Sequence, residues 1–246
     1  MLEPRLADIY LDGRHYDRLD GLSVGGNQDL PFWIGQAKRY GDPVLELACG
    51  TGRVSVPLAQ AGFRVTGIDL WEAMLQEARR KSAEAGARVE WVRADMRALD
   101  LGKSFCLVIL PANALCHLLD LSDFEACMAS VRRHLARYGR LVVSVFVPKA
   151  ELLTDQPGKR FPFAEYDDPD GRGRIVVTHS YVYEPGTQIK RITTHQAIPG
   201  QSEEIEGELT LRMWYPQELD ALLKYNGFVI ESKLGGQPDL ICMAGY

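Results

Sequence analysis

Between residues 43 and 147, short apolar runs alternate with longer stretches of helical periodicity. Two of the longer stretches, 71–85 and 121–138, place their apolar residues on one helical face. The apolar runs are bounded by Gly, Asp or Pro, as buried strands are, and they are residues 43–47, 64–68, 89–92, 105–110 and 141–145. This alternation predicts an α/β fold with a parallel, Rossmann-like sheet and right-handed crossovers.

From residue 161 to 213 the apolar residues recur with period two instead. Residues 175–183 are rich in β-branched and aromatic side chains, and a turn and a second extended stretch, 188–197, follow. These residues predict a hairpin. With a third extended stretch at 204–213, they predict a small antiparallel sheet inserted into the α/β fold.

The rest of the chain frames these two patterns. The first forty residues hold scattered aromatic side chains and are typical of a helical cap or lid rather than a domain. A helix at 216–226, which Gly227 ends, and strands at 228–230 and 240–243 would return the chain to the parallel sheet. We therefore expect a cap, a core, an insertion and a completion of the core, at residues 1–40, 41–160, 161–213 and 214–246.

Composition narrows the class of protein. The 246 residues carry a net charge of -5, and 46% of them are apolar, which is typical of a globular protein. The acidic balance disfavours a nucleic-acid partner, and no apolar run approaches the roughly 18 residues that span a bilayer. Five cysteines without a C-x-x-C pair favour a reducing, cytoplasmic location. We expect a small-molecule partner, no membrane partner and no metal site.

Two glycines mark the first turn of the core. Gly50 and Gly52 follow the first predicted strand and precede a helix, where the chain must turn sharply and let a ligand approach its backbone. Asp69 ends the second strand, nineteen residues after Gly50. A carboxylate at this spacing accepts hydrogen bonds from ribose hydroxyls, so the sequence predicts a ribose-containing cofactor.

Residues near this turn favour one class of cofactor over another. A dinucleotide fingerprint has a third glycine at the position of Ser55, which brings the helix close to a pyrophosphate. Glu46 adds negative charge, which repels a pyrophosphate and suits a cationic amino acid with a sulfonium group. Arg53 either pairs with Glu46 or caps the next turn, or it contacts the cofactor. S-adenosylmethionine fits better than NAD.

Three ordered motifs make the chain resemble the class I S-adenosylmethionine-dependent methyltransferases: residues 46–53, 67–70 and 94–96. The resemblance implies a seven-stranded sheet with its last strand antiparallel. It also implies that the loop from Ala48 to Gly52 contacts the methionine part of the cofactor and Asp69 its ribose. By the same resemblance Leu70 lies at the adenine face, and Asp95 and Met96 at the adenine amino edge.

Two further regions concern closure of the site and the methyl acceptor. Tyr16, or Tyr10 in its place, is similar to the segment that closes over the cofactor in small-molecule members of the family. The fourth strand ends at Leu110, and the loop after it borders the reacting methyl group in the family. It lacks the Asn/Asp-Pro-Pro-aromatic motif of enzymes that methylate amino groups of nucleic acids or proteins. His117, in this loop, is the candidate general base, with a helix-facing surface histidine as the alternative.

These observations predict a methyltransferase that transfers a methyl group in line to a nitrogen or oxygen atom of a small molecule. The inserted sheet resembles a substrate wall or a dimer contact, so monomer and homodimer both stay open. A nicotinamide-dependent oxidoreductase, a non-catalytic cofactor-binding protein and an RNA methyltransferase are the alternatives. His179 and His195 lie on the predicted hairpin, but no third ligand accompanies them, which favours an ordinary sheet face over a metal site.

Overall fold

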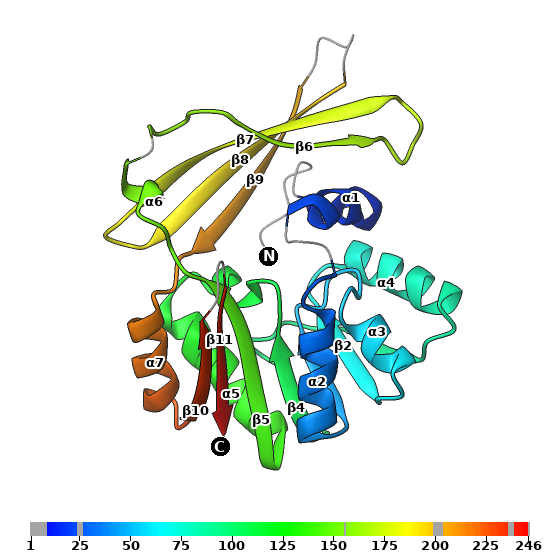
Figure 1. Cartoon of the computed structure of the whole chain (residues 1–246), viewed down its shortest axis with the longest axis vertical. Coiled ribbons are helices and arrows are strands. Elements are labelled where there is room, and N and C mark those ends of the chain that lie inside the picture. Colours follow the sequence, from blue (N-terminus) through cyan, green and yellow to red (C-terminus); the bar gives the residue numbers. More distant parts are fainter. Residues whose placement is uncertain (1–8, 24–26, 155, 199–203, 236–238, 246) are drawn as a thin grey trace.

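The computed structural model describes residues 9–23, 27–154, 156–198, 204–235 and 239–245. They form a large α/β unit and a smaller antiparallel sheet, with the helix α1 (Gly13–Ser23) between the two (Figure 1). The predicted parallel Rossmann-like sheet and the separate antiparallel sheet are therefore confirmed.

The large sheet has the strand order β10-β11-β5-β4-β1-β2-β3. Strands β1 to β5 are parallel, because each pairs with its neighbours in parallel register, and β11 is antiparallel to both β5 and β10. The strands are β1 Val44–Leu47, β2 Val65–Asp69, β3 Val89–Arg93, β4 Phe105–Leu110, β5 Leu135–Phe146, β10 Val229–Gly235 and β11 Asp239–Gly245.

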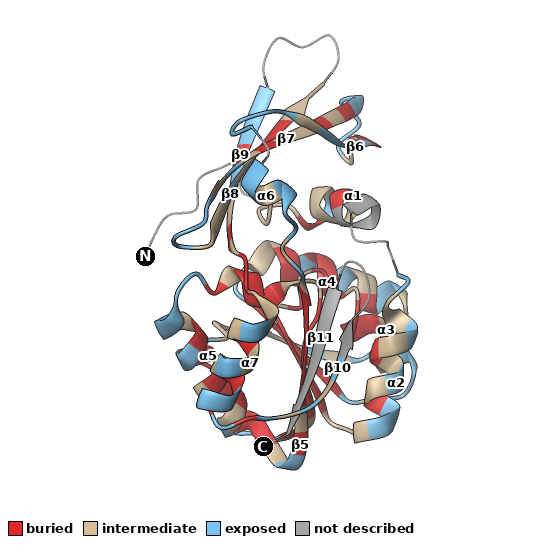
Figure 2. Cartoon of the chain, turned by 60° about the vertical axis from the view of Figure 1, so that its left-hand side comes forward, coloured by how far each residue is buried: buried red, intermediate tan, exposed pale blue. Residues whose placement is uncertain are grey.

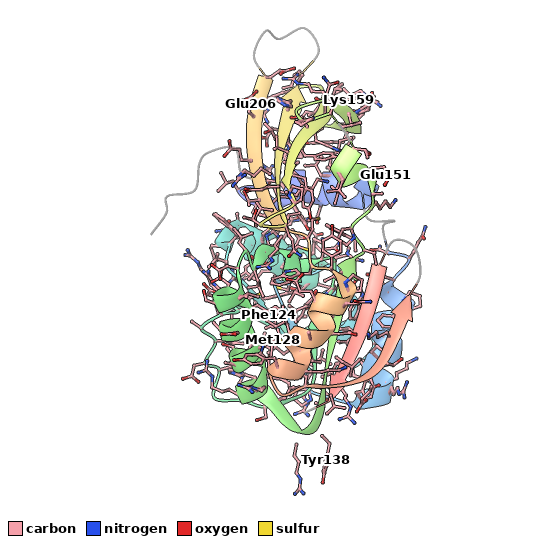
Figure 3. The ribbon with its side chains drawn as sticks, turned by 90° about the vertical axis from the view of Figure 1, so that its left-hand side faces the viewer. Phe124, Met128, Tyr138, Glu151, Lys159 and Glu206 are labelled. Atoms are coloured by element: carbon pink, nitrogen blue, oxygen red, sulfur yellow. The ribbon has the colours of Figure 1, made fainter. Side chains whose placement is uncertain are left out.

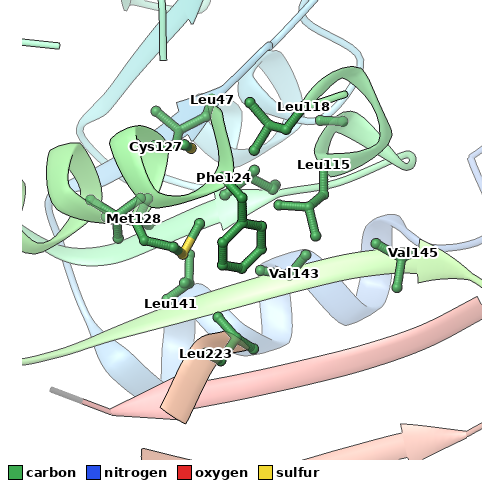
Figure 4. Close-up of a cluster of buried hydrophobic side chains, with 14 of the residues drawn as sticks. Leu47, Leu115, Leu118, Phe124, Cys127, Met128, Leu141, Val143, Val145 and Leu223 are labelled. Carbon is green, nitrogen blue, oxygen red and sulfur yellow. The ribbon is translucent and has the colours of Figure 1, made fainter. Parts of the chain in front are cut away.

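Helices cover both faces of this sheet. On one face α2 and α3 pack through Trp33 and Leu58 against Val44 and other strand residues. On the other face α5 and α7 bury Phe124 and Leu223 against β5 (Figure 4). The helical elements of the large unit are α2 Leu30–Tyr40, α3 Ser55–Gln60, α4 Glu72–Glu84, η1 Ala114–His117, α5 Leu121–His134 and α7 Pro216–Tyr225.

The small sheet follows the short helix α6 (Glu151–Thr154) and pairs its strands antiparallel in the order β6-β7-β8-β9. Lys159 and Glu206 mark its end farthest from the core, whereas Phe124 and Met128 lie within the large unit (Figure 3). The strands are β6 Phe161–Asp167, β7 Arg174–Glu184, β8 Ile189–Ala197 and β9 Glu204–Arg212. The predicted hairpin is present as β7 and β8, and β9 forms an edge of the sheet.

The register of this hairpin separates the two histidines. His179 lies opposite Thr194, and His195 lies opposite Thr178. Because successive residues of a strand point to opposite faces, the two imidazoles lie on different faces of the sheet. An ordinary sheet position therefore describes both better than a shared metal site.

One predicted helix is too long. The stretch 121–138 was expected to be helical throughout, but α5 ends at His134 and Leu135 already pairs with Phe105 in the large sheet. The imidazole of His134 accepts a hydrogen bond from the backbone N–H of Leu101 at 2.9 Å and lies 2.7 Å from the carbonyl oxygen of Ser130. These contacts fix the end of the helix against the loop before β4.

The segment 1–40 serves two purposes in its described residues. Helix α2 packs into the core of the large unit through Trp33 and Ala37, which are 1% and 0% exposed. Helix α1 instead lies under the small sheet and above α4 (Figures 1 and 2). Only α1 has the position expected of a cap.

Candidate functional site

A cavity of about 510 Å³ opens at the carboxyl ends of β1, β2, β3 and β4, below the small sheet. This is the edge of a parallel sheet at which α/β proteins bind ligands. Its lining combines residues from six regions: Tyr10, Tyr16, Ala48, Gly50, Ile68, Asp69, Leu70, Trp71, Ala94, Asp95, Met96, Arg97, Pro111, Ala112, Ala114, His117, Leu118, Leu119, Glu208, Leu209 and Thr210. Eight of the twelve predicted site residues lie here: Tyr16, Ala48, Gly50, Asp69, Leu70, Asp95, Met96 and His117.

Asp69 and the glycine turn are held together by hydrogen bonds. The Oδ2 atom of Asp69 accepts from the backbone N–H of Gly50 at 2.8 Å, and Oδ1 accepts from that of Trp71 at 2.9 Å. Burial raises the pKa of the Asp69 carboxyl, although these hydrogen bonds oppose the change. Ala48 and Gly50 both have positive φ, 52° and 54°, so the turn is sharp enough to place its backbone at the cavity.

Gly52 lies beside the cavity without lining it. A Cβ atom on Gly52 would come within 2.7 Å of the Trp91 ring, and one on Gly67 would come equally close to the same ring. Both glycines of the motifs therefore make room for an indole on β3. The contact of Gly52 with a cofactor stays a prediction beside this packing role.

Glu46 lies inside the protein behind the turn, at 3% exposure. Its carboxylate accepts a short hydrogen bond from the hydroxyl of Ser55. Burial raises its pKa to about 7, and this hydrogen bond and the positive charge of Arg53 act in the opposite direction. Glu46 does not line the cavity, and its role at the cofactor site stays a prediction.

Arg53 faces α2 instead of the cavity. Its guanidinium donates to the carboxylate of Asp29 with Nη2 at 3.0 Å from Oδ2, and Asp29 also accepts from the Trp33 indole at 2.8 Å. The positive charge of Arg53 also acts on the buried Glu46 carboxyl, and the predicted cap of the next turn and contact with the cofactor stay predictions. The side chain of Leu110 is fully buried in the core and does not line the cavity, so its contact with the cofactor stays a prediction.

The third motif supplies the far wall of the cavity. Asp95 accepts hydrogen bonds from the Arg97 guanidinium, with Nη2 at 2.7 Å, and Arg97 also pairs with Asp123 at 2.8 Å. The bonds from Arg97 hold the pKa of Asp95 below its usual range, although burial opposes them. Leu70 is 49% exposed and lines the cavity with Met96, which gives this wall an apolar surface suited to a flat ring.

Another part of the lining contains His117 and the aromatic side chains near the start of the chain. The Nε2 atom of His117 lies 3.1 Å from the hydroxyl of Tyr10, and burial lowers the pKa of the imidazole to about 4. The Tyr10 ring lies 5.6 Å from that of Tyr16 and 6.3 Å from that of Trp71. His117 is therefore a cavity residue in its neutral form rather than a surface histidine.

Several residues that line the cavity are not part of any sequence motif described above. Trp71 follows the second motif by one residue, and its place before a helix could have indicated that its ring lies at the cavity. Residues 208–210 come from the edge strand β9 and form the side of the cavity next to the small sheet. No periodicity or spacing relates them to Gly50, because only the folding of the inserted sheet brings the two together.

One group of potential metal ligands lies outside this cavity. His15, Asp168 and Asp170 have ligand atoms within 4.8 Å of one another. Arg172 forms an ion pair with Asp168 at 2.5 Å, and Arg14 forms one with Asp170 at 2.9 Å. Two guanidinium groups therefore already balance the carboxylates, so this cluster is explained as an ion-pair network.

Among the helices in the described residues, none is long and apolar enough to cross a membrane.

The sequence of the chain is similar to sequences of methyltransferases. The family model described as "Methyltransferase domain" matches residues 44–139. YqeM of Bacillus subtilis (strain 168) is 35% identical over 131 residues, which are 53% of this chain and 52% of that protein. The chain thus spans about half the length of this curated relative.

Solved structures share the fold over nearly the whole chain. An S-adenosylmethionine-dependent methyltransferase from Clostridium acetobutylicum is 18% identical with a TM-score of 0.77, covering 94% of this chain and 96% of that one. SAM-bound CalS10 from Micromonospora echinaspora, an amino pentose methyltransferase, is 21% identical with a TM-score of 0.70, covering 100% and 99%. With the family model, these matches confirm the predicted resemblance to S-adenosylmethionine-dependent methyltransferases.

Proposed function

We propose that this chain, whose residues 44–139 form a methyltransferase domain, binds S-adenosylmethionine and transfers its methyl group to an amine nitrogen of a small molecule. The observation that carries the proposal is the hydrogen bond from the Gly50 backbone N–H to the Asp69 carboxylate, at the edge of a cavity of about 510 Å³. Small-molecule and cofactor sites have about 300 to 1,000 Å³, so the cavity has the right size.

The described residues fit each part of the cofactor. Asp69 offers carboxylate oxygens to the ribose hydroxyls, and Leu70 with Met96 offers an apolar surface to the adenine. The loop from Ala48 to Gly50 places backbone groups toward the amino-acid part. The lining described by the structure holds carboxylates at Asp69, Asp95 and Glu208, which suits a ligand with a sulfonium and an ammonium group.

The protein's part in the reaction is to position the cofactor and the methyl acceptor and to enclose them. The sulfonium supplies an activated methyl group, so the acceptor nitrogen has only to approach in line with the S–CH3 bond. Holding the two reactants in this arrangement lowers the activation barrier by up to about 7 to 11 kcal/mol. Tyr10, Tyr16 and Trp71 exclude water on one side, and the neutral imidazole of His117, whose Nε2 atom lies 3.1 Å from the Tyr10 hydroxyl, adds no positive charge that would repel the sulfonium.

The charges on the acceptor side favour an amine over an anionic or phenolic acceptor. Glu208 of β9 brings a carboxylate to the same cavity as His117, whose low pKa keeps it uncharged at neutral pH. Arg97 is the one Lys or Arg among the described lining residues, and it is paired with both Asp95 and Asp123. An ammonium acceptor is thus attracted to the cavity, and it releases a proton to solvent water before its nitrogen lone pair attacks. The N–CH3 bond then forms as the S–CH3 bond breaks, and S-adenosylhomocysteine is the leaving group.

Calorimetric titration with S-adenosylhomocysteine, with NADH as the control ligand, tests the cofactor class. We expect binding of S-adenosylhomocysteine alone, whereas binding of NADH alone would support the nicotinamide-dependent alternative. Amino sugars and simple amines, each beside the alcohol of the same skeleton, then test the acceptor class by mass spectrometry of the methylated product. Methylation of the alcohols alone would contradict the amine. The cytoplasmic location and the homodimer stay predictions.

A further inference from the structure

We propose that α1 is a positioning helix that links the cofactor loop to the small sheet, and that Asp17 is the residue that fastens it to that loop. The inference rests on the proposed function, because it assigns a consequence to binding of the cofactor. Filling the cavity orders the glycine turn, the turn holds α1, and α1 holds the sheet that borders the acceptor side.

The side of α1 that faces the large unit carries a three-residue network. Lys81 of α4 donates to Asp17 with Nζ at 2.8 Å from Oδ2, and to the Thr51 hydroxyl oxygen at 3.1 Å. The Thr51 hydroxyl in turn donates a short hydrogen bond to Asp17. Thr51 lies between Gly50 and Gly52 and is 2% exposed, so Asp17 reaches the buried centre of the cofactor loop.

A glycine lets α1 approach α4 closely enough for this network. A Cβ atom on Gly13 would lie 2.6 Å from the Cβ of Glu77, a contact that real side chains do not make. Glu77 is itself held by Arg80, whose Nη2 lies 2.5 Å from Oε1, so it cannot readily move aside. The start of α1 is thus fitted to the surface of α4.

The opposite side of α1 contacts the small sheet. Arg14 pairs with Asp170 at 2.9 Å, and the Nδ1 atom of His15 lies 3.1 Å from the Tyr166 hydroxyl. Leu19 is 5% exposed in a cluster with Tyr166 and Ile175. α1 therefore lies between the two units with specific contacts on both sides (Figures 1 and 2).

This arrangement connects the two halves of the cavity. Tyr16 lines the cavity directly before Asp17 in the chain, so whatever holds Asp17 also sets the Tyr16 ring. The sheet that α1 contacts through β6 ends at β9, which supplies residues 208–210 to the acceptor side. Asp17 acts through these neighbours, so we assign it a positioning role and no chemical step.

Hydrogen exchange with and without S-adenosylhomocysteine tests the inference in the full chain. In the wild-type protein we expect the ligand to slow exchange in residues 13–19 and in residues 167–174. In Asp17→Ala at saturating ligand, we expect slowing in neither segment and an affinity lower by roughly tenfold, from loss of charge-assisted hydrogen bonds. Asp17→Asn, which keeps the shape of the side chain, is the second variant if Asp17→Ala unfolds.

Asp42→Asn is the matched control. Asp42 is as exposed as Asp17, 30% against 29%, and pairs with Arg64 at 2.8 Å just before β1, away from the cavity. We expect this variant to behave like the wild type. The charge reversal of Asp17→Lys with Lys81→Asp should restore part of the affinity, because the opposite charges remain adjacent.

The outcomes separate two failures. Wild-type affinity and an unchanged exchange pattern in both Asp17 variants would overturn the positioning role and leave the proposed function standing. Slowed exchange in residues 13–19 alone would also overturn it, because the link to the small sheet would be missing. A wild-type protein that does not bind S-adenosylhomocysteine would refute the proposed function, and the inference with it.

Discussion

The carboxylate of Asp69 accepts a hydrogen bond from the backbone N–H of Gly50 at 2.8 Å, across the nineteen residues that separate them. The end of β2 thereby fixes the turn that follows β1. Asp69 also lines the cavity, so one side chain shapes the turn and faces the ligand. The spacing of a glycine turn and a later acid is thus a structural link as well as a binding feature.

Replacement of Asp69 should weaken cofactor binding. Asp69→Ala removes hydrogen bonds to a charged acceptor, which are worth about 1 to 3 kcal/mol. Calorimetry with S-adenosylhomocysteine measures the loss. Asp100→Asn is the control, since Asp100 is exposed and does not line the cavity. Equal affinities of the wild type and Asp69→Ala would contradict the assignment of Asp69.

Gly67 should be required for stability rather than for ligand contact. A Cβ atom there would lie 2.7 Å from the Trp91 ring and 3.0 Å from the Cys49 sulfur, so Gly67→Ala overpacks the site and costs about 1 to 3 kcal/mol. Urea unfolding measures the cost. Adding Trp91→Leu should recover part of it, and a double variant no more stable than Gly67→Ala would show that the indole is not the cause.

The stability of the protein should depend on pH through Glu46. Its pKa is about 7 in the folded state against 4.5 as the ordinary value, so the folded state holds the proton more tightly. The resulting stabilisation is complete below pH 4.5 and is lost as the pH rises to about 7. By linkage it amounts to about 3 kcal/mol.

The variant Glu46→Gln isolates this effect, because glutamine keeps an acceptor for Ser55 but does not titrate. Its free energy of unfolding should equal that of the wild type near pH 4.5 and exceed it increasingly up to pH 7, by about 3 kcal/mol at most. Urea unfolding of both proteins at several pH values measures the difference. A difference that stays constant with pH would show that folding does not raise the pKa of Glu46.

Local patterns predicted the large sheet and eight of the 21 residues that line the cavity. The hydrophobic period, the turn residues and the spacing from Gly50 to Asp69 can all be identified in the sequence without knowledge of the tertiary packing. The roles of Glu46 and Arg53 could not be predicted in this way. Both depend on which side chains surround them after folding, and Arg53 forms an ion pair with Asp29, the residue that precedes α2.

The end of α5 and the contribution of β9 show the same limit. Helical periodicity continues past His134, but pairing of Leu135 with Phe105 overrides it. Residues 208–210 reach the cavity only because the inserted sheet folds back over the core, and its strand pattern holds no information on that orientation. Long-range placement is thus the part that one sequence leaves open.

His117 should stay neutral well below neutral pH. Burial lowers its pKa to about 4 from 6.5, so the folded state resists the proton that the unfolded chain accepts. This contribution to stability is complete above pH 6.5 and is lost as the pH falls toward 4. The free energy of unfolding of the variant His117→Gln should therefore gain about 2 kcal/mol relative to that of the wild type between pH 7.5 and 5.

NMR of the imidazole, assigned with the same variant, gives the pKa of His117 directly, and a midpoint near 6.5 would contradict an enclosed neutral ring. A low midpoint would also mean that titration of His117 makes no contribution to any pH dependence of methyl transfer between pH 6 and 8.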